Sequence, residues 1–397
     1  MKITAIETLR LGEHPNILWT RIHTDEGVVG LGETFWAAAS VETYLHTDAA
    51  QQLLGEDPLA IDRISQKLRG YLGFRSTGIS MSGNSAVDIA LWDIFGKVTN
   101  QPIWQLLGGR ARDSIRIYNT CAGYRYVRDE GEVIMNWGLE KQEGPYEDLD
   151  AFLHRADELA HSLLEQGVTG MKIWPFDPYA EASGGLYISA EELQKSLGPF
   201  AKIRQAAGDK MDIMVEFHSL WNLPTAIRIA EALEPFNTFW HEDPIKMDSL
   251  ASLKAYAARS KAPICASETL GGRWAFRDLL ETQAAGVVML DLSWCGGLTE
   301  ARKIAAMADA WHLPVAPHDC TGPVVLTASV HFSTHANNAL IQETVRAFYY
   351  GWYQDLVTKL PPIQNGKIRP PEGPGLGIEL LPDLDKRPDA IVRRTGR

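Results

Sequence analysis

Charged side chains recur in the second half of the chain at the spacing of one strand–helix unit. Five of them follow one another at intervals of 23 to 27 residues, namely Glu216, Glu242, Glu268, Asp291 and His318. Each comes directly after a short apolar run, as Asp291 follows Val287–Leu290. Repeated βα units of about this length form a parallel sheet that is buried on both faces. The pattern predicts that these side chains lie in a ring at the carboxyl ends of successive strands, the active-site end of a (β/α)₈ barrel.

The residue types at these strand ends indicate a metal site and an acid–base pair. Carboxylate oxygens suit hard divalent cations, so Glu216, Glu242 and Glu268 predict a Mg²⁺ site. Asp291 and His318 lie one unit apart, which predicts a contact in which the Asp orients the imidazole and His318 acts as a base. A lone Glu is more often a surface carboxylate and a lone His a hydrogen-bonded core residue. The shared register of all five nevertheless favours a common site.

Strand geometry adds further candidates to this site. Residues two apart on a strand share a face, so His218 borders the same pocket as Glu216, and Trp174 points the same way as Lys172. Lys172 has two interpretations, because an unpaired ammonium is costly to bury. Either its side chain extends to the rim, or it binds a carboxylate or enolate oxygen of the substrate. Glu343 continues the series one unit further along the chain.

Composition restricts the classes of function. The chain has 397 residues, 45% hydrophobic and 22% charged, which suits a globular barrel with a second, smaller domain. The net charge of −12, with no basic run to offset it, argues against nucleic acids and anionic membranes as partners. No apolar run reaches spanning length and no signal peptide precedes the first strand pattern, so we expect a cytoplasmic protein. The four cysteines are widely spaced and predict free thiols.

The order of the predicted elements divides the chain into three parts. Residues 1–114 show strands first and helices afterwards, which predicts an α+β domain. Residues 115–345 alternate between strand and helix, which predicts the barrel. Residues 346–397 no longer alternate, and we expect this tail to return to the first domain.

One predicted helix and two irregular segments accompany this division. Asn84–Val98 has its apolar residues at helical spacing, with a cap expected at Asn84 or Ser85. Residues 125–148 form a long polar segment with Gly and Pro, which predicts a lid over the site or a contact between subunits. Its neighbourhood carries four aromatic residues, Tyr124, Tyr126, Trp137 and Tyr146. Asp177–Leu186 also does not fit the alternation.

The chain resembles the enolase superfamily, in its mandelate racemase/muconate lactonizing enzyme branch. Motifs that are similar in order and type run along the whole chain: Gly30-Leu31-Gly32-Glu33, Ala86 to Asp93, Leu106-Leu107-Gly108-Gly109, Glu242-Asp243-Pro244, Ser267-Glu268-Thr269 and Gly296 to Ala301. The resemblance implies an α/β fold, a modified (β/α)₇β TIM barrel whose α+β capping domain is built from the N-terminal region and the C-terminal tail. It also implies a homo-oligomer with one Mg²⁺ per subunit, held by Glu216, Glu242 and Glu268.

The resemblance further implies the reaction type. A base removes the proton α to a carboxylate that binds the metal, and this base is a Lys or a His. Lys172 and Glu343, the latter protonated, would surround the oxygens on which charge develops. Many relatives carry Lys-x-Lys where this chain has Lys172-Ile173-Trp174, which argues against a two-base racemase. His218, two residues after the first ligand, matches the general acid of the sugar-acid dehydratases.

We therefore expect a dehydratase that acts on a small-molecule sugar acid, an aldonate or aldarate, and gives a 2-keto-3-deoxy acid. In it His318 takes the C2 proton and His218 protonates the departing C3 hydroxyl. One alternative is an epimerase, racemase or cycloisomerase with Lys172 as second catalytic group, and another is a non-catalytic carbohydrate-binding barrel. Trp19 and Arg75 are candidate substrate contacts from the first domain, with packing as their alternative role.

Overall fold

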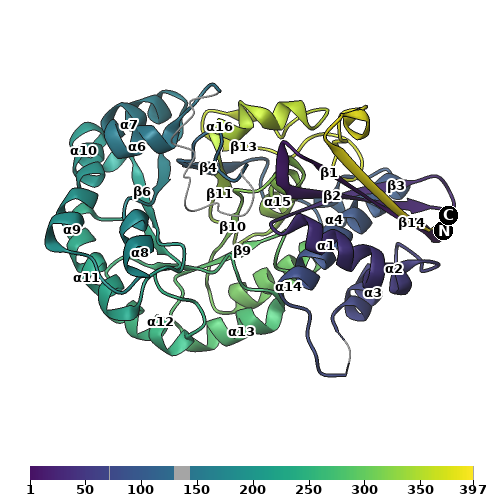
Figure 1. Ribbon diagram of the computed structural model, residues 1–397, viewed down its shortest axis with the longest axis horizontal. Coiled ribbons are helices and arrows are strands. Elements are labelled where there is room, and N and C mark those ends of the chain that lie inside the picture. Colours follow the sequence, from purple (N-terminus) through teal and green to yellow (C-terminus); the bar gives the residue numbers. More distant parts are fainter. Residues whose placement is uncertain (71, 129–143, 397) are drawn as a thin grey trace.

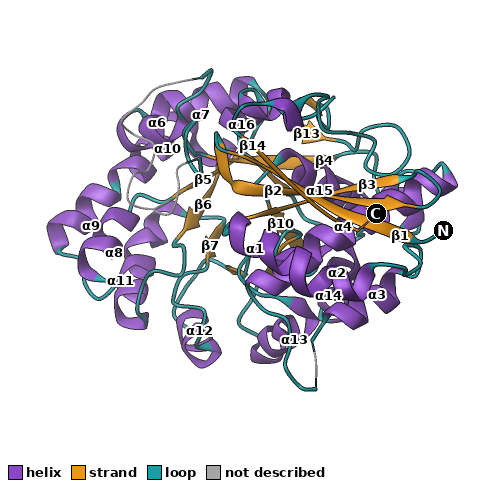
Figure 2. Ribbon diagram, turned by 45° about the vertical axis from the view of Figure 1, so that its right-hand side comes forward, coloured by secondary structure: helices purple, strands orange, loops and turns teal. Residues whose placement is uncertain are grey.

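Parallel strands curl into a barrel, and a second sheet with its own helices packs against one side of it (Figure 1; Figure 2). The computed structural model describes residues 1–70, 72–128 and 144–396. The barrel strands are β4 (Ile115–Thr120), β5 (Gly170–Ile173), β6 (Asp212–Glu216), β7 (Trp240–Glu242), β8 (Ile264–Ala266), β9 (Val287–Asp291), β10 (Val315–His318) and β11 (Gln342–Thr344). They pair in sequence order from β4 to β10. The ring closes because β11 pairs with β4, while Val315 of β10 bridges to Ala339 just before β11.

Helices cover the outside of this ring, as the predicted barrel requires. They are α6 (Asp148–His154), α7 (Ala156–Glu165), α8 (Asp177–Ser183), α9 (Ala190–Ser196), α10 (Gly198–Ala207), α11 (Leu223–Leu233), α12 (Leu250–Ala257), α13 (Gly272–Thr282), α14 (Gly297–Ala310) and α15 (Pro323–His335). In Figure 1 the helices from α7 to α13 form an arc around the strands.

One irregular segment of the sequence is a helix in the structure. Asp177–Leu186 opens with α8, which has Pro178 in its first turn and ends at Gly184 with φ +63°. Proline is tolerated in a first turn because the N–H it lacks would have no helical partner. A glycine at a left-handed position is a common helix end. The Gly and Pro that obscured the pattern are therefore the two boundaries of the helix.

The two-residue period of the strands decides which side chains enter the barrel. On five strands an apolar side chain inside the barrel precedes a charged or histidine side chain by two positions: Met214 and Glu216, Trp240 and Glu242, Met289 and Asp291, Ala316 and His318, Ile341 and Glu343. The apolar members form one buried cluster together with Tyr118 and Cys265. The barrel is therefore filled by apolar side chains below and presents titratable groups at its carboxyl end.

The capping domain consists of an antiparallel sheet and helices. Its strands are β1 (Ile3–Leu11), β2 (His14–Thr24), β3 (Val29–Phe35) and β14 (Ala390–Gly396), and its helices are α1 (Ala38–Tyr44), α2 (Ala50–Leu53), α3 (Ile61–Leu68), α4 (Ile79–Thr99) and α5 (Ile103–Leu106). The tail passes through α16 (Arg346–Tyr349), β12 (Ile363–Gln364) and β13 (Lys367–Ile368), which pairs with β4. It then returns to the capping domain, where β14 pairs with β1 and brings the two termini together (Figure 1). The fold class is as predicted, whereas the exact boundaries at residues 114 and 345 remain predictions.

The first helix of the sequence analysis starts earlier than predicted. Helix α4 begins at Ile79, with Gly78 as its N-cap. The expected caps lie inside it, where the Asn84 amide donates to the Leu68 carbonyl at 2.9 Å and the Ser85 hydroxyl to the Met81 carbonyl at 2.9 Å. Both polar side chains satisfy groups within the packed domain, and this tertiary use overrides their preference for helix starts.

Buried carboxylates of the capping domain cap helices of the barrel. Glu33 of β3 accepts hydrogen bonds from the N–H groups of Val324 and Val325 at 3.1 and 2.9 Å, at the start of α15. Asp88 of α4 accepts one from the N–H of Thr299 at 2.9 Å, in the first turn of α14. A Cβ at Gly322 would lie 2.4 Å from the Glu33 carboxylate. The glycine therefore permits the close approach that fixes the capping domain on the barrel.

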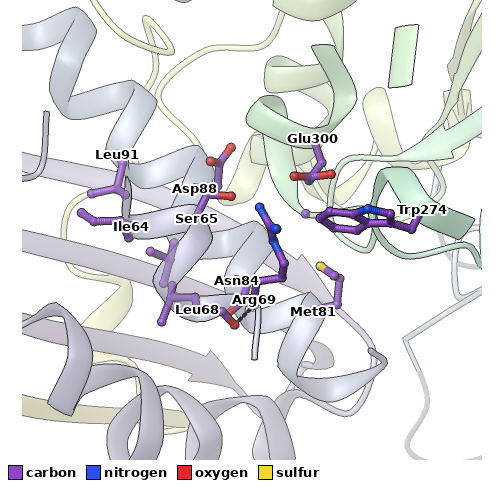
Figure 3. A pocket seen from close by; sticks show the side chains of 12 residues that line it. Ile64, Ser65, Leu68, Arg69, Met81, Asn84, Asp88, Leu91, Trp274 and Glu300 are labelled. Atoms are coloured by element: carbon purple, nitrogen blue, oxygen red, sulfur yellow. Dashed lines mark hydrogen bonds between the residues drawn. The ribbon is translucent and has the colours of Figure 1, made fainter. Parts of the chain in front are cut away.

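The interface between the two domains is closely packed. Figure 3 shows residues around a small cavity there, among them Arg69, Met81 and Asp88 of the capping domain and Trp274 and Glu300 of the barrel. The volume of this cavity is about 20 Å³. A space of this size admits about one water molecule. The domains consequently meet without a gap that could hold a larger ligand at this place.

Two predictions from composition can be compared with the structure. All four cysteines are buried free thiols, as expected. Within the described ranges, no helix combines the length and the apolar character needed to cross a bilayer.

Replacing Glu33 with Ala should lower the free energy of unfolding by on the order of 3 kcal/mol, because the Trp19 indole N–H and two helix N–H groups would lose their acceptor in a buried place. The measurement is the shift of the urea unfolding midpoint. Glu158→Ala is the matched control, since Glu158 is 68% exposed and pairs with Arg155 at the surface, and it should change stability by less than about 0.5 kcal/mol. Equal midpoints for the two variants would contradict the capping role.

Candidate active site

A cavity of about 830 Å³ opens at the carboxyl end of the barrel, between the barrel and the capping domain. Five residues proposed from the sequence line it: Lys172, Trp174, His218, Glu268 and His318. The capping domain contributes Phe35 and Trp36 from the end of β3 and residues 77–79 and 82 around the start of α4. The ring of strand ends is thus the floor of a substrate-sized chamber.

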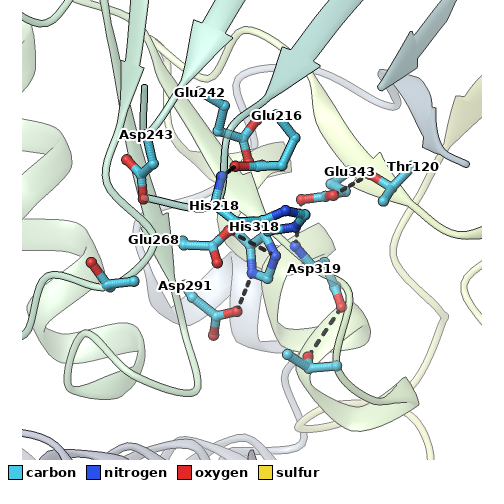
Figure 4. A network of polar contacts seen from close by, with 12 residues as sticks. Thr120, Glu216, His218, Glu242, Asp243, Glu268, Asp291, His318, Asp319 and Glu343 are labelled. Carbon is cyan, nitrogen blue, oxygen red and sulfur yellow. Dashed lines mark hydrogen bonds and ion pairs between the residues drawn. The ribbon is translucent and has the colours of Figure 1, made fainter. Parts of the chain in front are cut away.

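Three carboxylates converge on the floor of this chamber. One oxygen each from Glu216, Glu242 and Glu268 lies within 4.8 Å of the other two. Glu216 and Glu242 are register partners on β6 and β7, and Figure 4 shows their side chains next to each other. Glu216 Oε2 lies 3.2 Å from Lys172 Nζ, and Glu268 Oε2 lies 3.0 Å from His318 Nε2. Buried carboxylates need positive charge close by, and the all-carboxylate donor set fits a hard cation such as Mg²⁺.

The carboxylates of this cluster differ in their affinity for a proton. Burial and the neighbouring charge of Glu216 raise the pKa of Glu242 well above its usual range. Burial acts in the same direction on Glu216, but His218 and Lys172 outweigh it and lower the pKa of Glu216 to about 2. Glu242 therefore binds a proton more readily than Glu216, with which it shares a hydrogen bond.

Lys172 lies inside the cluster, so the interpretation that places it at the rim is wrong. Its side chain is 2% exposed, and its Nζ lies 3.2 Å from Glu216, 3.0 Å from Glu343 and in contact with Glu242. Burial lowers the pKa of Lys172, but the charges of Glu242 and Glu343 outweigh it and leave the pKa well above its ordinary value. The side chain is therefore an ammonium that links β5 to three other strands.

Glu343 is ionised in this arrangement, whereas the resemblance required a protonated hydrogen-bond donor. Its two oxygens accept hydrogen bonds from the Thr120 hydroxyl and, at 2.8 Å, from the N–H of Asp319. Burial raises the pKa of Glu343, but Lys172 and His318 outweigh it, and the net shift is downward. Glu343 thus acts as the counter-charge of Lys172.

The predicted contact between Asp291 and His318 is present. His318 Nδ1 lies 2.6 Å from Asp291 Oδ2, and its Nε2 lies 3.0 Å from Glu268 Oε2 (Figure 4). The N–H of Ser293 donates to the other oxygen of Asp291 at 2.5 Å, and the Trp294 ring stacks on the imidazole with centroids 5.4 Å apart. Burial lowers the pKa of His318, but Glu268 and the other carboxylates around it outweigh burial and raise it well above the ordinary value. The ring is held from both nitrogens and one face.

A second Asp–His pair, which the sequence analysis missed, lies just beyond the ends of β5 and β6. His218 Nδ1 contacts Asp177, which is fully buried at the start of α8. Burial lowers the pKa of His218, but Asp177 and Glu216 outweigh it and raise the pKa to about 9. The edge of the Trp174 ring lies against the imidazole, with centroids 5.6 Å apart. Asp177 also follows a barrel strand closely, so the rule that found Asp291 would have found it.

Two candidate substrate contacts lie elsewhere. Trp19 is 1% exposed and its indole N–H donates to Glu33 at 2.7 Å, because its face of β2 is turned into the capping-domain core. Arg75 places its guanidinium 5.5 Å from the Trp274 ring and does not line the cavity. Both therefore have the packing role that was their alternative.

The predicted lid or subunit contact lies largely outside the described residues, which resume at 144. Trp137 is among the residues that the structure leaves out. Of the aromatic residues nearby, Tyr126 lines the cavity and packs on Trp174, with ring centroids 5.5 Å apart. The role of the whole segment stays a prediction.

Comparison with known proteins places these observations in a family. Residues 8–108 match the mandelate racemase/muconate lactonizing enzyme N-terminal domain, and residues 155–384 match the family described as enolase C-terminal domain-like. A D-galactonate dehydratase of Cronobacter sakazakii is 32% identical over 388 residues, which cover 96% of this chain and 92% of that protein. An enolase of the mandelate racemase subgroup from Agrobacterium tumefaciens has 60% identity and a TM-score of 0.88, with 100% and 99% of the two chains covered. An enolase protein from Sargasso Sea environmental sequencing has 41% identity and a TM-score of 0.89, with the same coverage.

Binding of Mg²⁺ should release a proton over the pH range in which Glu242 is protonated, because the cation and the proton compete for the same carboxylate. The affinity should then fall by about tenfold for each pH unit below the pKa of Glu242. Titration calorimetry in two buffers of different ionisation enthalpy measures the released proton directly. Glu242→Gln should bind Mg²⁺ more weakly and without proton release, and the outcome that rejects the site is Mg²⁺ affinity in this variant equal to that of the wild type.

Proposed function

The chain belongs to the mandelate racemase/muconate lactonizing enzyme family of the enolase superfamily, and from this premise we propose a Mg²⁺-dependent dehydration of a sugar acid to a 2-keto-3-deoxy acid. The protein is an enzyme of the lyase type. The similarity to D-galactonate dehydratases over nearly the whole chain supports a sugar-acid dehydratase. It leaves no support for a non-catalytic carbohydrate-binding barrel.

One observation carries the choice of reaction: two histidines, each backed by a buried aspartate, line the same cavity. Dehydration needs a base for the C2 proton and an acid for the C3 hydroxyl. The pair of His318 with Asp291 supplies the first, and the pair of His218 with Asp177 supplies the second. A reaction that needed a single proton transfer would leave one pair without a purpose.

His318 is the proposed base. When bound, a Mg²⁺ held by Glu216, Glu242 and Glu268 would supply positive charge to the substrate carboxylate and so stabilise the charge that develops on it. Of the groups that raise the pKa of His318, Glu268 contributes most. A cation bound by Glu268 would offset its negative charge and so lower the pKa of His318. His318 Nε2 is then free to take the C2 proton. Asp291 at Nδ1 holds the tautomer and stabilises the imidazolium that forms.

His218 is the proposed acid. Its pKa of about 9 keeps the imidazole protonated near neutral pH, as an acid for a poor leaving group must be. Since Asp177 occupies Nδ1, Nε2 is the nitrogen that donates its proton to the C3 hydroxyl. Water leaves, the C2–C3 double bond forms, and the enol tautomerises to the 2-keto acid.

Lys172 argues against the alternative of an epimerase or cycloisomerase. In that reaction its amine would exchange a proton with the substrate. The contacts with Glu216, Glu242 and Glu343 hold it as an ammonium with a pKa well above its ordinary value. We propose that it stays protonated throughout and offsets negative charge beside the substrate carboxylate.

Assembly and location also remain proposals. We propose a cytoplasmic homo-oligomer, on the resemblance and on the composition of the chain. Size-exclusion chromatography coupled to light scattering measures the oligomeric state.

His318→Asn should abolish exchange of the C2 proton in deuterated solvent, whereas His218→Asn should stop dehydration but retain exchange when proton removal is reversible. Each change should reduce its step by about 10²- to 10⁴-fold. Proton NMR of the substrate reports exchange, and a keto-acid assay reports dehydration. Wild-type dehydration by His218→Asn would assign the acid to another residue.

Asp177→Asn should move the alkaline limb of the kcat profile to lower pH. The His218 pKa is raised in the folded enzyme chiefly by Asp177, so loss of that charge lowers it, and the acid loses its proton earlier as pH rises. Asp150→Asn is the control, because Asp150 makes a similar pair with His154 at the surface. An unchanged alkaline limb in Asp177→Asn would separate His218 from the acid role.

A further inference from the structure

We propose that the sugar acid is a monocarboxylate whose end furthest from the carboxylate is apolar, as in a 6-deoxy aldonate. This inference rests on the proposed function and deepens it, because it concerns the part of the substrate that does not react. It comes from the uneven distribution of polar groups around the cavity.

An unbroken run of aromatic rings leads away from the proposed base. Trp294 stacks on His318, Phe35 lies 6.3 Å from Trp294, and Trp36 lies 6.4 Å from Phe35, all between ring centroids. These three rings line the cavity, and Trp36 is 44% exposed. Aliphatic side chains of Ile79, Leu270 and Ala275 complete this wall. A substrate anchored at the carboxylate cluster would therefore extend along an apolar surface.

Three polar groups on this side of the cavity are already engaged within the protein. The Trp294 indole N–H donates to the Phe35 carbonyl at 2.9 Å. The Ser82 hydroxyl donates to the Gly78 carbonyl at 3.2 Å, and the Thr269 hydroxyl bonds to that of Ser267 at 2.9 Å. A substrate hydroxyl placed there would exchange its hydrogen bonds with water for fewer partners on the protein, which costs free energy.

Unused polar groups gather at the other side, around His218. Trp174 Nε1, the Ser219 hydroxyl and Asp243 Oδ1 are buried atoms that find no hydrogen-bond partner among the described residues, and all three residues line the cavity. Donors and acceptors of this kind suit the hydroxyls close to the reacting carbons. The cavity is thus built for a molecule that is hydroxylated near its carboxylate and apolar at its far end.

The charges of the cavity exclude a second carboxylate. In the part of the chain that the structure describes, Lys172 is the one Lys or Arg side chain that lines it, and Glu216, Glu242 and Glu343 surround that ammonium. The distal carboxylate of an aldarate would lie against aromatic rings, where none of the described residues offers a Lys or Arg side chain to receive it. Burying an unpaired carboxylate is strongly unfavourable. The aldonate alternative is therefore favoured over the aldarate.

A matched panel of acids tests this inference. Each set contains an aldonate, its 6-deoxy form and its aldarate, all with the same configuration at C2 to C5. The 6-deoxy acid should have a kcat/KM about 10- to 100-fold above its parent, the range by which an apolar pocket disfavours an added hydroxyl, and the aldarate should not be converted. A parent acid that equals or exceeds its 6-deoxy form overturns the inference while the dehydratase proposal stands.

Substitution of the wall gives a second, independent test. Ile79→Asn places a hydrogen-bonding group on it and should narrow the ratio between the 6-deoxy acid and its parent by about tenfold. Leu59→Asn is the matched control, because Leu59 and Ile79 are both 37% exposed and Leu59 lies outside the cavity lining; it should leave the ratio unchanged. If the ratio of kcat/KM between the 6-deoxy acid and its parent is equal in the two variants, the wall does not recognise the distal end of the substrate.

Binding to His318→Asn, measured by calorimetry, keeps the two proposals distinguishable. This variant should still bind the 6-deoxy acid more tightly than its parent, whether or not turnover occurs. If it binds the panel with the expected preference but the wild type forms no keto acid, the dehydratase proposal fails and the apolar end is supported. If no acid of the panel binds, both proposals fail.

Discussion

The arrangement of the barrel end depends on one buried ammonium among carboxylates. Lys172 of β5 contacts Glu216 of β6, Glu242 of β7 and, across the ring closure, Glu343 of β11. Neither partner could be buried alone, since an isolated charge in an apolar interior is strongly unfavourable. Together they allow titratable side chains to stand directly above the apolar filling of the barrel. This mutual dependence fixes the strand ends in the register that the rest of the site requires.

The same electrostatic balance connects the proposed cation site with the proposed proton transfers. Glu268 belongs to the carboxylate cluster and also contacts His318, while Glu216 lies in the cluster and raises the pKa of His218. A change of charge in the cluster is therefore felt by both histidines. The aspartates behind them, Asp291 and Asp177, hold each ring by Nδ1. The proposed base and acid thus have partners of the same type, one at the end of β9 and the other at the start of α8.

Strand β3 and the residue after it give the capping domain two roles, docking on the barrel and lining the cavity. Glu33 of β3 caps the start of α15 and so fixes the domain on the barrel. Phe35 and Trp36, two and three residues later, enter the cavity as part of its apolar wall. The contact that docks the domain therefore also sets the position of the wall that we propose to recognise the distal end of the substrate. A change in docking would alter specificity without touching the reacting groups.

The sequence by itself determined the barrel, the return of the tail and the convergence of Glu216, Glu242 and Glu268, because strand period and βα length are local properties that place residues at strand ends. It did not determine the environment of each side chain. Trp19 is a residue type common in substrate contacts, but its indole N–H donates to Glu33 in the core. Asn84 is a residue type common at helix N-caps, but its side-chain amide donates to the Leu68 carbonyl. Asp177 is an ordinary acidic residue in the sequence and becomes the partner of His218 only when the start of α8 meets the turn after β6. Hydrogen-bond partners, burial and the pKa values that follow from them arise between residues far apart in the chain, so tertiary structure alone decided them.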